Sequence, residues 1–242
     1  MSEPDELFTL RNHFWLGSYQ LAIAEGSGLG RLPEALRVER DEFIYRSYLA
    51  LGQFSIVLGE IKDDAPPALQ AVRLMAQYLS NPESREIVIE TLKMWLTDPA
   101  SCNNPTVQLM AAAVFMHEGD LKEALRSIRN GVTMEQTAML AQIYLKMDRV
   151  DLALKQVRVL KQADDDATLT QLVVAWVHLA QGASGTRRPL TSLTSSSTST
   201  RQGIYLTSAP SRRCTWESTR RPRPVSSRPS ARARMMQTRS ST

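Results

Sequence analysis

The sequence contains little that would support a disulfide framework, a metal centre or a membrane span. Only Cys102 and Cys214 are present among 242 residues, and their wide separation predicts neither a disulfide pair nor a zinc site. This scarcity of cysteine is typical of proteins in the reducing cytosol. The N-terminus lacks the basic start and apolar run of a signal peptide. The longest apolar stretch, Leu172 to Ala180, is interrupted by His178 and is shorter than the roughly 18 to 20 residues of a membrane span.

Candidate catalytic and ligand-binding residues are also scarce. The three histidines are scattered, without a second ligand type at metal spacing, and are interpreted as helix-face or core residues: His13, His117 and His178. The glycine-rich stretch 26–30 follows a predicted helix, and no Lys-Ser or Lys-Thr comes after it, which argues against a phosphate-binding loop. The aspartates at 164–166 lack calcium-loop spacing and are predicted to cap the next helix. We therefore predict no catalytic residue, no metal, no cofactor and no enzymatic activity.

What the sequence does contain is a repeated phrase. It consists of a turn residue, a large apolar residue two positions later, and a small or branched residue three positions after that. The four copies are Gly17 with Tyr19 and Ala22, Gly52 with Phe54 and Val57, Gly119 with Leu121 and Ala124, and Asp148 with Val150 and Ala153. They are 35, 67 and 29 residues apart, and 67 corresponds to two units. The phrase is typical of the tight turn and close packing of a tetratricopeptide hairpin, whose unit is roughly 34 residues.

The apolar spacing predicts five helical hairpins and one further helix. A weaker copy of the phrase, with Pro82 at the turn and Ile87 at the small position, fills the double gap. Stretch 26–30 is interpreted as a flexible connection after the first hairpin, and helix 169–180 has no predicted partner after it. We therefore predict an all-α, tetratricopeptide-like solenoid over residues 1–182. Such a stack offers an extended concave surface for a peptide or another helical subunit.

Composition changes sharply after Gly182. Residues 183–242 hold twelve arginines and one glutamate, a charge of +11, so the net charge of +4 leaves −7 for residues 1–182. With few large apolar residues this segment is predicted to be a disordered tail rich in Arg, Ser, Thr and Pro. The codons that can encode residues 215–222 can also be read in the frame that begins at the third base of each codon. In that frame, permitted codon choices encode Met-Gly-Glu-Tyr-Glu-Glu-Ala, which is a further copy of the turn phrase. The tail is therefore predicted to derive from a frameshift, with a natural alternative C-terminus as the other interpretation.

The amino-acid sequence of the repeats resembles that of the epsilon subunit of the COPI coatomer over Asp5 to Gly182. The most specific stretches are 5–8, 17–20, 38–41, 48–50, 69–73 and 164–172, followed by Ala175 and Trp176. The resemblance implies a structural subunit of the vesicle coat that acts in retrograde Golgi-to-ER and intra-Golgi transport. It also implies a cytoplasmic protein, peripheral on Golgi and coated-vesicle membranes, which binds other coatomer subunits, chiefly the C-terminal region of the alpha subunit. Members of this family continue with further hairpins where the tail begins here.

Two other functions remain as alternatives at this point. A tetratricopeptide co-chaperone or adaptor would gather Lys and Arg in its groove to hold a peptide carboxylate, and the charge of −7 on the repeats disfavours it. An RNA-binding protein would use the arginines of the tail to contact phosphates. Regular Arg-Ser alternation, Arg-Gly-Gly repeats and interleaved aromatic residues are all missing, so no nucleic-acid partner is expected.

Overall fold

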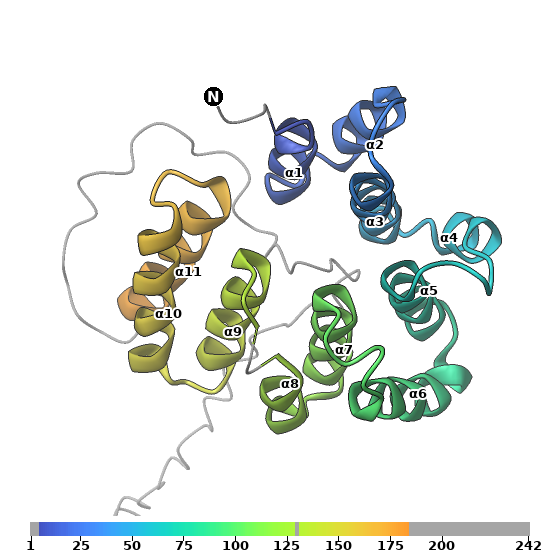
Figure 1. The fold of residues 1–242 in the computed structure, drawn as a ribbon. Coiled ribbons are helices and arrows are strands. Elements are labelled where there is room, and N and C mark those ends of the chain that lie inside the picture. Colours follow the sequence, from blue (N-terminus) through green and yellow to red (C-terminus); the bar gives the residue numbers. More distant parts are fainter. Residues whose placement is uncertain (1–4, 129–130, 184–242) are drawn as a thin grey trace, which may run out of the picture. The chain divides into compact units, whose positions relative to one another are not determined.

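The computed structural model describes residues 5–128 and 131–183, all within one structural unit (Figure 1). These residues form eleven α-helices and a short 3-10 helix, and none of them lies in a strand, which confirms the all-α fold. In the same ranges, no helix has both the length and the apolar character that crossing a membrane requires. The predicted tail, 183–242, lies outside the described residues apart from Ala183 at the end of the last helix.

The helices follow one another as five hairpins and a final helix. In chain order they are α1 (Phe8–Trp15), α2 (Tyr19–Gly28), α3 (Glu34–Ala50), α4 (Phe54–Glu60), α5 (Pro67–Ser80), η1 (Pro82–Ser84), α6 (Arg85–Thr97), α7 (Pro105–Glu118), α8 (Leu121–Ile128), α9 (Met134–Lys146), α10 (Val150–Ala163) and α11 (Thr168–Ala183). Several starts are set by local chemistry. Pro67 occupies the first turn of α5, where its missing N–H is no loss. The Asn104 side chain accepts the N–H groups of Thr106 and Val107 at the start of α7.

The odd-numbered helices form a closed series of contacts. Each contacts the next odd-numbered helix along the chain, and α11 returns to contact α1. Each even-numbered helix contacts the odd-numbered helices before and after it. In Figure 1 the even-numbered helices accordingly lie outside the odd-numbered ones. The first and last described helices are therefore neighbours, although more than a hundred residues separate them.

The core lies along the odd-numbered helices. From Thr106 to Met116 of α7, every side chain except that of Gln108 is buried. A helix that is apolar all round is expected where other helices surround it, and α7 contacts α5, α6, α8 and α9. A smaller apolar cluster under α1, α2 and α3 is centred on Leu10, Phe14 and Phe43.

Three local predictions were wrong. The stretch 26–30 is not simply a connection, because α2 continues through Gly28 and Gly26 is buried in it. Ile87 does not occupy the small position of its repeat: it is 67 % exposed, and Val88 is buried instead at 2 %. The aspartates do not cap the first turn of α11. Asp164 accepts the N–H groups of Asp166 and Ala167, which precede the helix, so it closes the turn that leads into it.

Candidate interaction surfaces

The predicted repeat residues lie at four separate hairpin turns. Gly17, Gly52 and Gly119 have φ angles of 79°, 77° and 82°, and Asp148 has φ 57°. In each turn the following residue donates its N–H to the carbonyl five residues earlier, as in Arg149 to Tyr144 at 2.8 Å. This pattern ends a helix and reverses the chain, and it requires the left-handed conformation that glycine adopts at least cost.

The other repeat residues begin and anchor the even-numbered helices. The large apolar residues are each the first residue of their helix and are half-buried: Tyr19, Phe54, Leu121 and Val150. Three residues later a small or branched side chain is fully buried against the preceding helix: Ala22, Val57, Ala124 and Ala153. The structure therefore does not bring these twelve predicted residues together at one site. They have one architectural role that is repeated four times.

A buried polar cluster occupies the centre of the odd-numbered helices. The Arg46 guanidinium of α3 lies 2.9 Å from a carboxylate oxygen of Glu42 and 2.9 Å from one of Glu135 on α9. Trp15 of α1 donates its indole N–H to Glu135 at 2.9 Å. Thr106 of α7 donates its hydroxyl to Glu42 at 2.7 Å. Side chains of four helices, α1, α3, α7 and α9, therefore meet at this cluster.

Burial controls the chemistry of this cluster. The Arg46 side chain is 1 % exposed, and its guanidinium lies 4.7 Å from the Phe14 ring centroid and 5.1 Å from that of Phe43. Desolvation raises the pKa of Glu42 against the opposing effect of Arg46, and the second carboxylate, Glu135, adds to the rise. Two carboxylates thus share one buried guanidinium, so removing either partner would leave a buried charge less well compensated.

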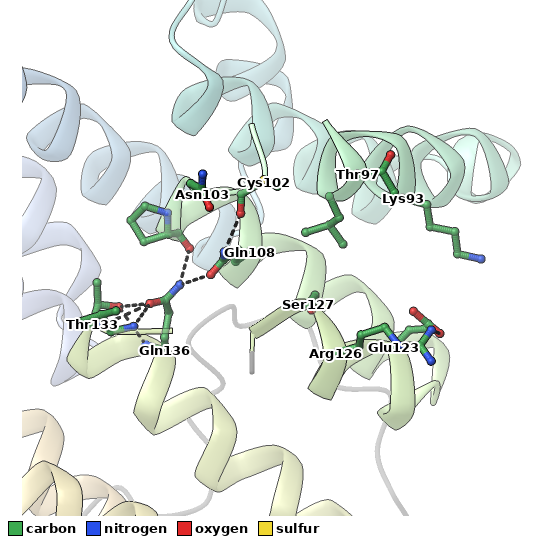
Figure 2. Close-up of a pocket in the computed structure, with 13 residues that line it drawn as sticks. Lys93, Thr97, Cys102, Asn103, Gln108, Glu123, Arg126, Ser127, Thr133 and Gln136 are labelled. Atoms are coloured by element: carbon green, nitrogen blue, oxygen red, sulfur yellow. Dashed lines mark hydrogen bonds and ion pairs between the residues drawn. The ribbon is translucent and has the colours of Figure 1, made fainter. Parts of the chain in front are cut away.

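A cleft of about 690 Å³ lies between α6, α8 and the starts of α7 and α9 (Figure 2). Leu96, Pro105 and Val132 supply apolar lining, and Val132 is 92 % exposed. Lys93 and the Glu123–Arg126 ion pair, at 2.5 Å, lie on its α6 and α8 sides. The cleft is therefore an open, mixed surface rather than an enclosed cavity.

The amides beside this cleft are held in place by internal hydrogen bonds. Gln136 donates to Gln108 at 2.7 Å and accepts from the N–H groups of Val132 and Thr133. Gln108 in turn donates to the carbonyl of Cys102 at 2.6 Å. Figure 2 shows this chain of bonds along the wall. The amides join the starts of α7 and α9, which is a structural role.

The three histidines lie apart from one another. His117 packs against the Tyr78 ring with centroids 6.1 Å apart, and burial, with the nearby charges of Lys146 and Arg85, lowers its pKa. His13 lies in the last turn of α1, and His178 is exposed on α11. Within residues 5–128 and 131–183, no group of three His, Cys, Asp or Glu side chains is placed to hold a metal ion.

The central cluster was missed by sequence reasoning. The pairing of Glu42 with Arg46 had a local signal, because these residues are four positions apart on a predicted helix and so share a face. The pairing of Arg46 with Glu135 had no such signal, since Glu135 lies 89 residues further along the chain.

Comparison with known proteins places these features in one family. A sequence model of the coatomer epsilon subunit matches residues 3–189. Coatomer subunit epsilon-1 of Arabidopsis thaliana is 49 % identical over 184 residues, which are 76 % of this chain and 63 % of the relative. Coatomer subunit epsilon of Dictyostelium discoideum is 36 % identical over 196 residues, covering 78 % and 65 %. That of Caenorhabditis elegans is 36 % identical over 184 residues, covering 75 % and 62 %. The chain thus spans less than two thirds of the length of these curated relatives.

Proposed function

Because this chain belongs to the coatomer epsilon subunit family, we propose that it is a structural subunit of the COPI vesicle coat. In that role it acts as a protein-binding scaffold in retrograde Golgi-to-ER and intra-Golgi transport. The observation that carries the proposal is the family match over residues 3–189, which covers every described helix. The same relatives disfavour the co-chaperone alternative, because each of those named above is itself a coatomer subunit.

The proposed partners are other coatomer subunits, chiefly the C-terminal region of the alpha subunit. The protein would be cytoplasmic and would reach Golgi and coated-vesicle membranes through the coat. The described surface supports a binding role rather than catalysis. Its buried ionic cluster is occupied by its own four helices, and its cleft is lined by amides already bonded to one another.

Affinity purification of the tagged full chain from cytosol tests the proposal. Arabidopsis coatomer epsilon-1 carrying the same tag is the positive control, and the tag alone is the negative control. We expect coatomer subunits, with the alpha subunit prominent, to co-purify with the chain. Recovery of a folding chaperone in their place would favour a co-chaperone, and complexes lost on nuclease treatment would favour an RNA-binding protein. Either result would overturn the coat assignment.

A further inference from the structure

The cleft between α6, α8 and the starts of α7 and α9 has the size of a ligand site but not its enclosure (Figure 2). Its volume of about 690 Å³ lies within the roughly 300 to 1,000 Å³ of small-molecule pockets. Those pockets bury most of the surface of the molecule they hold. An open cleft instead suits a ligand that keeps one side in solvent. A short stretch of polypeptide is such a ligand, because only some of its side chains need to enter.

Three apolar side chains line this cleft together. Val132 is 92 % exposed, yet its backbone is fixed, because its N–H donates to the Gln136 side chain at 2.9 Å. Leu96 of α6 is half-buried, and Pro105 is the first residue of α7. Because burial of apolar surface is favourable, this part of the lining favours a ligand that brings an apolar side chain of its own.

The charged lining of the cleft is cationic, although the repeats as a whole are acidic. Lys93 and Arg126 line it with one carboxylate, Glu123, a net charge of +1, whereas residues 1–182 carry −7. Arg126 is 77 % exposed and bonds Glu123 through Nη1, which leaves other N–H donors of the guanidinium for a ligand. Lys93 is exposed, and no hydrogen bond or ion pair joins its ammonium group to another described residue. Both cations are therefore available to an anionic group.

Asn103 adds a group that can bind a peptide backbone. Figure 2 shows it near the start of α7, away from the end of the cleft where Lys93 and Arg126 lie. Asn103 is exposed, and its side chain forms no hydrogen bond within the described part of the chain. An amide both donates and accepts, and an extended peptide has unpaired N–H and C=O groups, whereas a helix has already paired its own. The cleft therefore favours an extended segment over a helix.

We propose that this cleft binds a short, extended, acidic segment of another protein. An apolar side chain of that segment packs against Leu96 and Val132, and a neighbouring carboxylate lies beside Lys93 and Arg126. The chain's own residues 183–242 do not match this chemistry, because they carry twelve arginines and one glutamate, and the two cations of the cleft repel such a charge. The site is independent of the proposed coat role, because it rests on the lining residues alone.

The experiment uses the full chain and a library of random synthetic octapeptides as the probe. Peptides retained by the tagged wild-type chain are offered to the Lys93→Glu variant, and those that the variant no longer retains are sequenced. We expect these peptides to share one large apolar residue with Asp or Glu within the next two or three positions. The most frequent peptide is then resynthesised with a fluorophore, and its dissociation constant is measured by fluorescence anisotropy.

Matched substitutions separate the cleft from the rest of the surface. Lys93→Glu should weaken binding about fivefold or more, and Val132→Asp about tenfold, which corresponds to about 1.4 kcal/mol. The controls make the same changes outside the cleft lining, at the exposed Lys122 of α8 and at Val159 of α10, which is 51 % exposed. Lys122→Glu and Val159→Asp should bind within about twofold of wild type. Circular dichroism establishes that all four variants keep the helical content of wild type.

Cys102 supplies a second measurement, because it lines the cleft and is half-buried. In the full chain carrying Cys214→Ser it is the only thiol, and saturating peptide should slow its reaction with a maleimide severalfold. An unchanged rate would place the peptide elsewhere and overturn the proposal. So would a library in which no peptide is lost on Lys93→Glu, or in which the lost peptides are basic. Concentration-dependent self-association that Val132→Asp abolishes would also overturn it, because a second copy would then be the occupant.

Discussion

Arg46 and Glu135 form a buried ion pair between α3 and α9, with Nη1 and Oε2 2.9 Å apart, although 89 residues separate them in the sequence. Each is also bonded within the cluster, Arg46 to Glu42 and Glu135 to the indole of Trp15. The pair joins hairpins that are not neighbours in the sequence. It thereby links the N-terminal helices directly to the later ones, across the middle of the odd-numbered series.

Glu135→Gln should be destabilising because it removes one of the two carboxylates that balance the buried Arg46. The expected loss in the free energy of unfolding is roughly 2 to 4 kcal/mol, somewhat below the full cost of orphaning a buried charge because Glu42 remains. Urea denaturation followed by circular dichroism measures it. Glu123→Gln is the control, since its partner Arg126 is 77 % exposed, and an exposed pair contributes less than about 1 kcal/mol. Equal losses in the two variants would contradict this account.

Glu42 should give stability a distinctive pH dependence. Its pKa is raised in the folded state by burial, against the guanidinium of Arg46 and the hydroxyl of Thr106, with the carboxylate of Glu135 adding to the rise. The folded chain therefore holds this proton more tightly than the unfolded chain. Its contribution is fully present below the unfolded pKa, about 4.3, and is lost as the pH rises through the folded pKa.

Glu42→Gln should remove that contribution. The difference in unfolding free energy between wild type and variant should shift against wild type as the pH rises above about 4.3 and then become constant. Urea denaturation of both proteins at a series of pH values measures this difference. The contributions of the other carboxyl groups cancel in it, because wild type and variant share them. A difference that moves in favour of wild type over that range would show that the carboxyl is held ionised instead.

Gly119→Ala should be destabilising through backbone strain alone. Gly119 has φ 82°, and a Cβ there would have no atom within 4 Å beyond its own residue and its two chain neighbours. The expected loss is about 1 to 2 kcal/mol, the cost of placing an L side chain in the left-handed region. Gly59→Ala is the control, because a Cβ in α4 also meets open space and φ there is ordinary. Gly59→Ala should stabilise the folded state by about 0.4 to 1 kcal/mol. The midpoint temperature of thermal unfolding should therefore fall for Gly119→Ala and rise for Gly59→Ala.

Gly26→Ala should be destabilising through a steric clash. A Cβ on Gly26 would lie 2.7 Å from Cγ1 and 2.8 Å from Cδ1 of Ile44 in α3. Overpacking of this kind costs roughly 1 to 3 kcal/mol, against a gain of about 1 kcal/mol in helix propensity. In an Ile44→Ala background the same substitution should become stabilising. A double-mutant cycle in urea measures this coupling, and additive effects would contradict the proposed contact.

Local structure was largely predictable from the residues. Gly17, Gly52 and Gly119 marked the turns because left-handed backbone is nearly exclusive to glycine, and the residues two and five positions later marked the next helix. Prediction failed where a local pattern had two interpretations. Gly26 indicates a helix break when it is considered in isolation, but it lies inside α2, where a Cβ would be only 2.7 Å from Cγ1 of Ile44 in α3. Ile87 and Val88 are adjacent and both apolar, and only the packing of α6 decides which one is buried.

The sequence by itself determined most of the helices and their pairing into hairpins, because these depend on residues within about 35 positions of each other. It also carried the resemblance to one family, through short stretches spread along the repeats. Only the tertiary structure decided that α1 contacts α11 and that Glu135 of α9 pairs with Arg46 of α3. These relationships depend on small rotations that accumulate from one hairpin to the next. No local pattern encodes such a sum, so residues over a hundred positions apart meet without any signal in the sequence near either of them.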